Sequence, residues 1–230
     1  NIPEEYGEVP DGKIIRKNLM EGNSSAISSS SGTAEATDRG IDYGVLQLLK
    51  IPVFWTLSIC NASSSMLIGT MTVHFIISLK DQGIPIQAGA WIWGATMLFS
   101  GAAQILGGWL GDRVPKNVAL CVFGLLQAIG VIFATFLTDI YLAPIFIVIF
   151  GLGFGARIPL GTAIRGEYFG RRAFGKVLGI SMVPTSAAMF AAPIFAGWWF
   201  DEQGSYDIAF YILGTISAIG SLGFLLAKKP

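Results

Sequence analysis

Residues 108–116, GWLGDRVPK, decide the fold, because they form a short charged turn between two long apolar stretches. The apolar stretches, residues 89–111 and 117–137, contain no Lys, Arg, Asp or Glu. Each is close to the ~20 residues that a helix needs to cross the hydrocarbon core of a bilayer. Lipid cannot hydrogen-bond to exposed backbone groups, so the pattern predicts two transmembrane helices joined at the membrane surface.

The same pattern extends over most of the chain. The 230 residues are 53% hydrophobic and 13% charged, against roughly 25% charged in soluble domains. Alternating ~10-residue strands, as in a membrane β-barrel, are absent. We therefore expect an all-α membrane protein with six transmembrane helices in residues 51–230. The predicted spans are residues 52–79, 89–111, 117–137, 141–164, 177–199 and 208–227.

Residues 1–50 have a different composition. Residues 24–32 contain six Ser among nine residues, and such a tract buries too little apolar surface to offset the entropy lost on ordering. We expect a mostly disordered linker that ends in a short amphipathic lead-in over residues 42–50. The chain begins with Asn1, which we interpret as the start of a fragment of a longer protein.

Charge in the connections predicts the orientation. Alternate connections place ten basic residues on one side of the membrane and only Lys80 on the other. Lys and Arg concentrate on the cytoplasmic side of membrane proteins, so both ends of the chain and the linker are expected in the cytoplasm. The ten residues are Arg39, Lys50, Arg113, Lys116, Arg165, Arg171, Arg172, Lys176, Lys228 and Lys229.

Two segments resemble each other within the chain. Residues 108–112, GWLGD, lead to KNVAL at 116–120, and residues 197–201, GWWFD, lead to YDIAF at 206–210. Each follows the second span of a set of three, but on opposite sides of the membrane. This predicts an inverted 3+3 repeat, typical of secondary transporters, although so short a match also arises by chance.

The turn at 108–116 resembles the signature loop of the major facilitator superfamily, Gly-x-Leu-x-Asp-Arg-x-Gly-Arg/Lys. It matches at Gly108, Leu110, Asp112, Arg113 and Lys116, and Pro115 stands where the family has glycine. The resemblance implies that residues 41–230 are the C-terminal half of a twelve-helix fold. It also implies that Gly108, Asp112, Arg113 and Lys116 latch one conformation of the transport cycle. An ordinary positive-inside turn is the alternative.

Two further segments narrow the resemblance. Residues 2–12, IPEEYGEVPDG, are similar to the segment that follows the sixth helix in bacterial monocarboxylate or oxalate:formate-type members of the superfamily. Residues 168–172, YFGRR, and residues 174–175, FG, likewise resemble the family's loop between helices ten and eleven. The resemblance therefore implies a bacterial inner (plasma) membrane protein. It also implies that the missing N-terminal six-helix half of the same chain is a partner of these residues.

Polar residues inside the spans are candidate substrate contacts, because polar groups are costly to bury in hydrocarbon. Asn61, Ser64 and Ser65 lie near the middle of the first span. Thr96, Ser100 and Gln104 form an i, i+4, i+8 stripe in the second, and Ser181 and Thr185 repeat the spacing in the fifth. For any single Ser or Thr, hydrogen bonding to its own helix is the alternative.

Two ionisable residues inside spans are candidates for more specific roles. Arg157 is either an anion anchor, since guanidinium pairs bidentately with carboxylate, or a side chain that snorkels to the cytoplasmic interface. His74, near the outer end of the first span, is a possible proton relay or a structural residue. By contrast, Gly151, Gly153, Gly155, Gly107 and Gly108 predict close helix packing rather than a dinucleotide site.

Several function classes are excluded. The net charge is zero, so the chain has no excess of positive charge that would attract the phosphates of nucleic acid. One His and two Cys are too few for a metal site. Residues 170–177, GRRAFGKV, approach the phosphate-binding pattern, but Val177 lacks the required hydroxyl, so we expect no ATP.

The sequence therefore predicts a secondary active transporter of a small solute, working by alternating access. It is not an enzyme, needs no cofactor, and its cargo is expected to be an organic anion such as a monocarboxylate. The alternatives are a six-span scaffold or signalling protein, or a channel.

Overall fold

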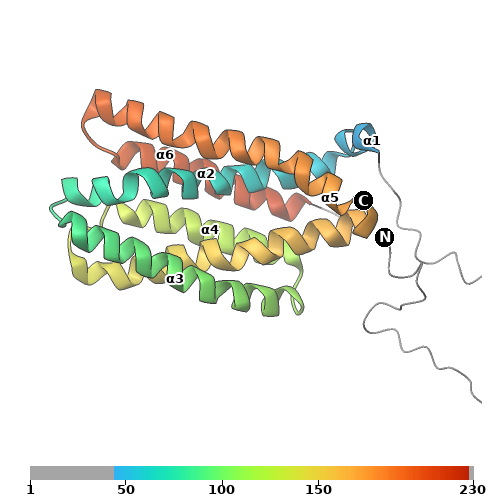
Figure 1. The fold of residues 1–230 in the computed structure, drawn as a ribbon, viewed down its shortest axis with the longest axis horizontal. Helices are drawn as coiled ribbons and strands as arrows, with labels where there is room; N and C mark the ends of the chain where they lie inside the picture. The colour runs from blue at the N-terminus through green and yellow to red at the C-terminus, as the bar shows by residue number, and fades with distance from the viewer. Residues whose placement is uncertain (1–43, 228–230) are drawn as a thin grey trace, which may run out of the picture. The chain divides into compact units, whose positions relative to one another are not determined.

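The computed structural model of the chain describes residues 44–227, except for the side chain of Arg171. Residues 1–43 of the predicted linker and the basic residues Lys228 and Lys229 lie outside the described residues. The described part of the linker contains a short helix, Val45–Leu49, where the lead-in is predicted. The described part is helical: α1 (Val45–Leu49), α2 (Pro52–Asp81), α3 (Ile86–Gly111), α4 (Lys116–Ala134), α5 (Ala143–Gln203) and α6 (Asp207–Gly223), with 3-10 turns η2 (Ile140–Leu142) and η3 (Phe224–Leu226). Successive passes run in alternating directions (Figure 1).

α5 contains two passes joined at one residue. Its 61 residues far exceed the ~20 needed for one crossing, and Gly170 interrupts the helix with φ 74° and ψ 170°. A side chain would be strained at this positive φ, whereas glycine is not. We call residues 143–169 the first arm of α5 and residues 171–203 the second arm.

The prediction of a charged connection over residues 165–176 was therefore wrong. Those residues continue the helices of the two arms, and only Gly170 has non-helical torsion angles. Charged residues were taken to mark the membrane surface, but a helix continues past that surface when nothing breaks its hydrogen bonding. Long Arg and Lys side chains near a helix end can bring their charged groups to water without such a break.

Five of the helical passes are long and apolar enough to cross a membrane: Pro52–Asp81, Lys116–Ala134, Ile140–Gly170, Arg172–Gln203 and Asp207–Leu226. The second predicted span, now α3, has 26 residues and no charged side chain but is not among the five. Gln87, Gln104 and several glycines and tryptophans reduce its hydropathy. Figure 1 shows α3 running alongside the other helices.

Glycines bring the first arm of α5 into close contact with its neighbours. A Cβ on Gly151 or Gly155 would meet the backbone of α3, and one on Gly153 would meet the backbone of Gln127 in α4. The predicted helix packing is thus confirmed for these three glycines and for Gly107, where a Cβ would meet the backbone of Ala156 in the first arm. It was wrong for Gly108, where a Cβ would meet nothing within 4 Å. The first arm is wedged between α3 and α4.

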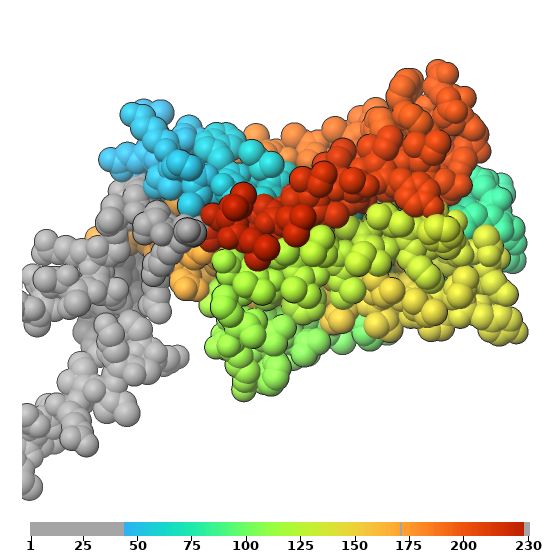
Figure 2. Space-filling view, turned by 180° about the vertical axis from the view of Figure 1, so that it is seen from behind, coloured from blue at the N-terminus to red at the C-terminus, as the bar shows by residue number. Residues whose placement is uncertain are grey.

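The remaining helices pack through apolar side chains. One buried cluster includes Phe75, Phe146 and Phe150, with ring centroids 4.6 Å apart for Phe75–Phe146 and 5.5 Å apart for Phe146–Phe150. A second cluster joins Phe54 and Phe169. Figure 2 shows α6, in red, between α2 and the second arm of α5 on one side and α4 on the other.

Candidate functional site

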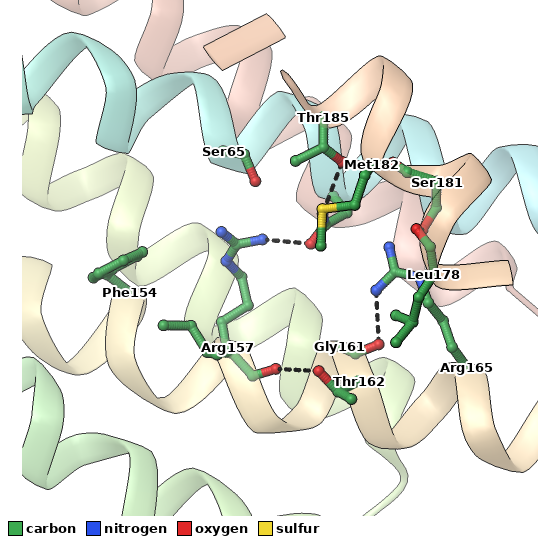
Figure 3. A pocket seen from close by; sticks show the side chains of 12 residues that line it. Ser65, Phe154, Arg157, Gly161, Thr162, Arg165, Leu178, Ser181, Met182 and Thr185 are labelled. Carbon is green, nitrogen blue, oxygen red and sulfur yellow. Dashed lines mark hydrogen bonds between the residues drawn. The ribbon is translucent and has the colours of Figure 1, made fainter. Parts of the chain in front are cut away.

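A pocket of about 190 Å³ lies between α2 and the two arms of α5 (Figure 3). α2 contributes Asn61 and Ser65, which are one helical turn apart and therefore share a face. The first arm contributes Arg157 and Arg165 among others, and the second arm contributes polar and apolar side chains: Leu178, Ser181, Met182 and Thr185. Three passes from distant parts of the sequence thus form its walls.

Arg157 points into this pocket. Its side chain is 4% exposed, and Nη1 donates a hydrogen bond to Asn61 Oδ1 at 3.1 Å. Asn61 Nδ2 in turn donates to Thr185 Oγ1 at 3.2 Å, and Thr185 Oγ1 donates to the Ser181 carbonyl at 2.8 Å. The structure therefore brings together three of the predicted substrate contacts, Asn61, Arg157 and Thr185. Arg157 reaches across to α2, which differs from the snorkelling alternative.

Arg165 is a pocket residue that the sequence interpretation missed. It is 6% exposed, and its Nη1 donates to the Gly161 carbonyl of its own helix at 2.7 Å. The sequence interpretation ended the fourth span at residue 164 and assigned Arg165 to a connection. The first arm continues as helix past residue 164, so Arg165 lies about two turns after Arg157 and about 80° around the helix axis from it. Both side chains still line the pocket.

The pocket has positive charge that nothing in its lining balances. Arg157 and Arg165 both line it, and no Asp or Glu does. Throughout residues 44–227, neither arginine forms an ion pair with a carboxylate, and Arg157 Nε is buried without a hydrogen-bond partner. A buried charge without a counter-charge is costly in a low-dielectric environment. An anion entering the pocket would relieve that cost.

Three other predicted contacts lie outside the pocket. Ser64 is fully buried, donates to the Cys60 carbonyl at 3.3 Å, and accepts from Gln127 Nε2 of α4 at its own carbonyl. Ser100 is buried where Gly155 of α5 packs on α3, and Gln104 is exposed. Adjacent helical residues differ by about 100° in direction, so Ser65 faces the pocket while Ser64 faces α4.

His74 lies away from the pocket lining, near the C-terminal end of α2. Its Nδ1 is 3.1 Å from Tyr206 Oη and its Nε2 is 2.9 Å from the Pro193 carbonyl oxygen. A carbonyl only accepts, so we assign a hydrogen to Nε2. Burial raises the pKa of the Tyr206 hydroxyl, and the carboxylates of Asp81 and Asp201 raise it further. Both ring nitrogens of His74 thus contact polar groups of this chain. A role for His74 as a proton relay stays a prediction.

The turn between α3 and α4 contains the signature-like residues. Arg113 lies over the Trp109 ring at 4.0 Å and donates to the Trp109 carbonyl at 3.1 Å. Gly108 is half-buried, and Asp112 is exposed where α3 ends. Arg113 is thus held against the last turn of α3.

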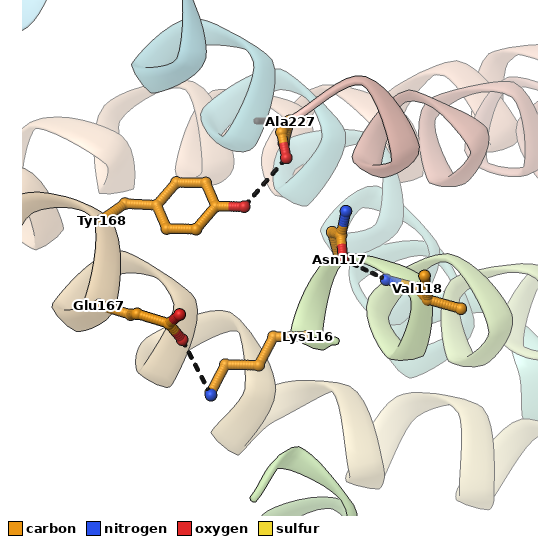
Figure 4. A network of polar contacts seen from close by, with 6 residues as sticks. All are labelled: Lys116, Asn117, Val118, Glu167, Tyr168 and Ala227. Atoms are coloured by element: carbon orange, nitrogen blue, oxygen red, sulfur yellow. Dashed lines mark hydrogen bonds and ion pairs between the residues drawn. The ribbon is translucent and has the colours of Figure 1, made fainter. Parts of the chain in front are cut away.

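The start of α4 is tied to the end of the first arm (Figure 4). Lys116 Nζ forms an ion pair with Glu167 Oε2 at 2.9 Å. The neighbouring Tyr168 hydroxyl donates to the Ala227 carbonyl at 2.9 Å, just after η3. The turn, the first arm and the C-terminal end of the described chain therefore meet on the side of the Gly170 bend. The latch role of Gly108, Asp112, Arg113 and Lys116 stays a prediction.

No metal centre is evident in the part of the chain that the structure describes. Residues 44–227 contain no group of three or more His, Cys, Asp and Glu side chains arranged to hold a metal ion. The side chains that line the pocket offer guanidinium, amide and hydroxyl groups, which bind oxyanions through hydrogen bonds.

Comparison with known proteins defines the class. Residues 47–230 match the model of the Major Facilitator Superfamily, and the chain belongs to that superfamily. This confirms the superfamily that the sequence resembles. Membership in this family of transporters, together with the apolar helices, makes the chain a multi-pass integral membrane protein.

Two curated relatives are similar to the chain. Monocarboxylate transporter 13 of Bos taurus is 27% identical over 154 residues, which are 65% of this chain and 35% of the relative. Monocarboxylate transporter 13 of Rattus norvegicus is 26% identical over 152 residues, again 65% and 35%. The matched region thus covers about a third of the length of these relatives.

Proposed function

We propose that the chain is the C-terminal half of a twelve-helix secondary transporter that carries a small organic anion, such as a monocarboxylate, by alternating access. The observation that carries this proposal is the burial of Arg157, which points into a pocket between helices and has no carboxylate partner among residues 44–227. Nothing is cut or formed in the cargo, so the activity is transport and not catalysis. The proposal includes no cofactor, no ATP and no nucleic acid.

Arg157 is suited to reversible binding of an anion. Its guanidinium donates to Asn61 Oδ1, a neutral acceptor. A carboxylate would form a stronger, bidentate interaction with the same group. The neutral acceptor offsets only part of the free-energy cost of burying the Arg157 charge. Binding of an anion would therefore be favourable. When the anion leaves, Asn61 Oδ1 again accepts the hydrogen bond, so binding stays reversible. The relatives are named monocarboxylate transporters, which supports this cargo.

The proposed architecture follows from the alternating passes. α3 crosses the membrane with the five more apolar passes, so the six form an inverted 3+3 repeat. The end with the Lys116–Glu167 pair faces the cytoplasm, because Lys and Arg concentrate there. The six helices of the missing N-terminal half complete the substrate site from the open side of the pocket. Alternating access is then a rocking of the two halves about this site. The bacterial inner membrane stays a prediction.

Transport by full-length protein in proteoliposomes tests the proposal. We expect counterflow uptake of labelled lactate or pyruvate, which labelled glucose and alanine do not share. Arg157→Gln should weaken the apparent affinity about tenfold or more, because a charged hydrogen-bond partner is lost. Arg172→Gln is the matched control, since Arg172 is exposed at the start of the second arm and does not line the pocket.

Two outcomes contradict the proposal. If well-folded protein carries none of the carboxylates, the assignment of the cargo is wrong. If Arg157→Gln transports as well as Arg172→Gln, the pocket is not the anion site.

A further inference from the structure

We propose that Arg165 is a second anion-binding group, and that the pocket therefore selects a small dicarboxylate over a monocarboxylate. This inference rests on the proposed function, because it names the class of anion that the same pocket takes. Each guanidinium would hold one carboxylate of the substrate.

The two arginines are close enough to share one small molecule. A Cβ built on Gly161 would lie 3.5 Å from Arg165 Nη1 and 3.8 Å from Asn61 Oδ1, and Asn61 Oδ1 is 3.1 Å from Arg157 Nη1. The distance between Arg157 Nη1 and Arg165 Nη1 therefore cannot exceed the sum of these three distances. Charged N–H···O bonds take about 2.8 Å at each end. This upper limit leaves at most the span of the two carboxylates of a small dicarboxylate, such as malonate or folded succinate.

Arg165 has donors to spare for this role. A guanidinium has five N–H donors, and the hydrogen bond that the structure gives for Arg165 is the one to the Gly161 carbonyl. An arginine that only marks the cytoplasmic end of a helix would extend towards water. Instead Arg165 is 6% exposed, and Figure 3 shows its guanidinium beside Ser181 of the second arm.

Gly161 keeps the space between the two cations open. Any side chain at this position would project into the gap between Arg165 and Asn61. A single methyl group there would make contacts of ordinary van der Waals length, so Gly161→Ala should fold normally. It would nevertheless occupy volume that the bridging anion needs.

The two-arginine arrangement predicts the direction of selectivity. A dicarboxylate compensates both buried charges, whereas a monocarboxylate leaves one of them unpaired. Leaving a buried charge without a partner is strongly unfavourable. Wild-type protein should therefore bind malonate or succinate more tightly than lactate.

The experiment measures counterflow of labelled malonate and labelled lactate by full-length protein in proteoliposomes, each over a range of concentrations. Arg165→Gln should weaken the apparent affinity for malonate about tenfold or more, with a much smaller effect on lactate. Arg165→Lys should recover part of the malonate affinity, because it keeps the charge. Gly161→Ala should weaken malonate more than lactate, and Arg172→Gln should change neither.

The outcomes separate this inference from the function on which it rests. If wild-type protein carries neither acid, the proposed function fails. If lactate is carried in an Arg157-dependent way while malonate is not, or if Arg165→Gln affects both acids equally, only the two-arginine inference fails. Size-exclusion profiles check folding, and if Arg165→Gln misfolds, Arg165→Lys and Gly161→Ala decide the question by the same comparison.

Discussion

A methyl group added at Gly155 should separate two helices, because the atoms that it would meet are backbone. A Cβ there would approach the Ser100 carbonyl oxygen and lie 2.8 Å from the carbonyl carbon and 2.9 Å from Cα of Ser100 in α3. Carbon atoms in contact prefer about 3.5–4.0 Å, so the first arm of α5 and α3 would have to part by roughly 1 Å. No rotation of a side chain can relieve contacts with backbone.

The size and sign of the effect follow from two opposing contributions. Overpacking costs about 1–3 kcal/mol, and three backbone contacts favour the upper part of that range. Alanine recovers about 1 kcal/mol of helix propensity over glycine. Gly155→Ala should therefore lower the free energy of unfolding by about 2 kcal/mol, which for a domain of this size corresponds to a thermal midpoint about 4–8 °C lower.

Gly101→Ala is the matched control in α3, because a Cβ at Gly101 would meet nothing within 4 Å. Only the gain in helix propensity remains, so its thermal midpoint should rise. Thermal unfolding of full-length protein in detergent, followed by the loss of the monodisperse size-exclusion peak, measures both. If Gly155→Ala raises the midpoint as Gly101→Ala does, then the close approach of the two helices at Gly155 is wrong.

Two further predictions concern contacts of different kinds. In Gly220→Ala the new Cβ would lie 2.7 Å from Ser63 Cβ, so this variant should have a lower thermal midpoint. Adding Ser63→Gly should restore the midpoint. Additive effects of the two changes would contradict this contact. Reversing one charge of the half-exposed Lys116–Glu167 pair with Glu167→Lys should cost less than about 1 kcal/mol at low salt. Adding Lys116→Glu should recover most of that loss, and a thermal shift that does not diminish at high salt would argue against an electrostatic origin.

Much of the fold could be predicted from the sequence, because long uncharged stretches have few alternatives in a membrane. α4, for example, begins at Lys116, one residue before the expected start of the third span. Charge was a less reliable guide to where a helix ends. Arg165 and Lys176 were taken to bound a connection, yet both are helical, and only Gly170 breaks the helix.

The candidate site was only partly predictable for a related reason. Arg157 was found because a charge inside an apolar segment stands out, but Arg165 was hidden by the misplaced end of its helix. Choosing Ser65, which lines the pocket, over Ser64, which does not, required knowing how α2 is rotated about its axis. That rotation is set by contacts with other helices, such as the hydrogen bond from Gln127 of α4 to the Ser64 carbonyl, and no local pattern encodes it.

The width of the pocket depends on the backbone conformation of a single residue, Gly170, where α5 bends. Arg157 and Arg165 lie on one side of it along the chain, and Ser181 and Thr185 lie on the other. Two facing walls of the pocket are therefore the two arms of α5, which are joined at Gly170. No flexible loop absorbs movement between them, so a small change in the φ and ψ of this glycine would alter the width of the pocket directly.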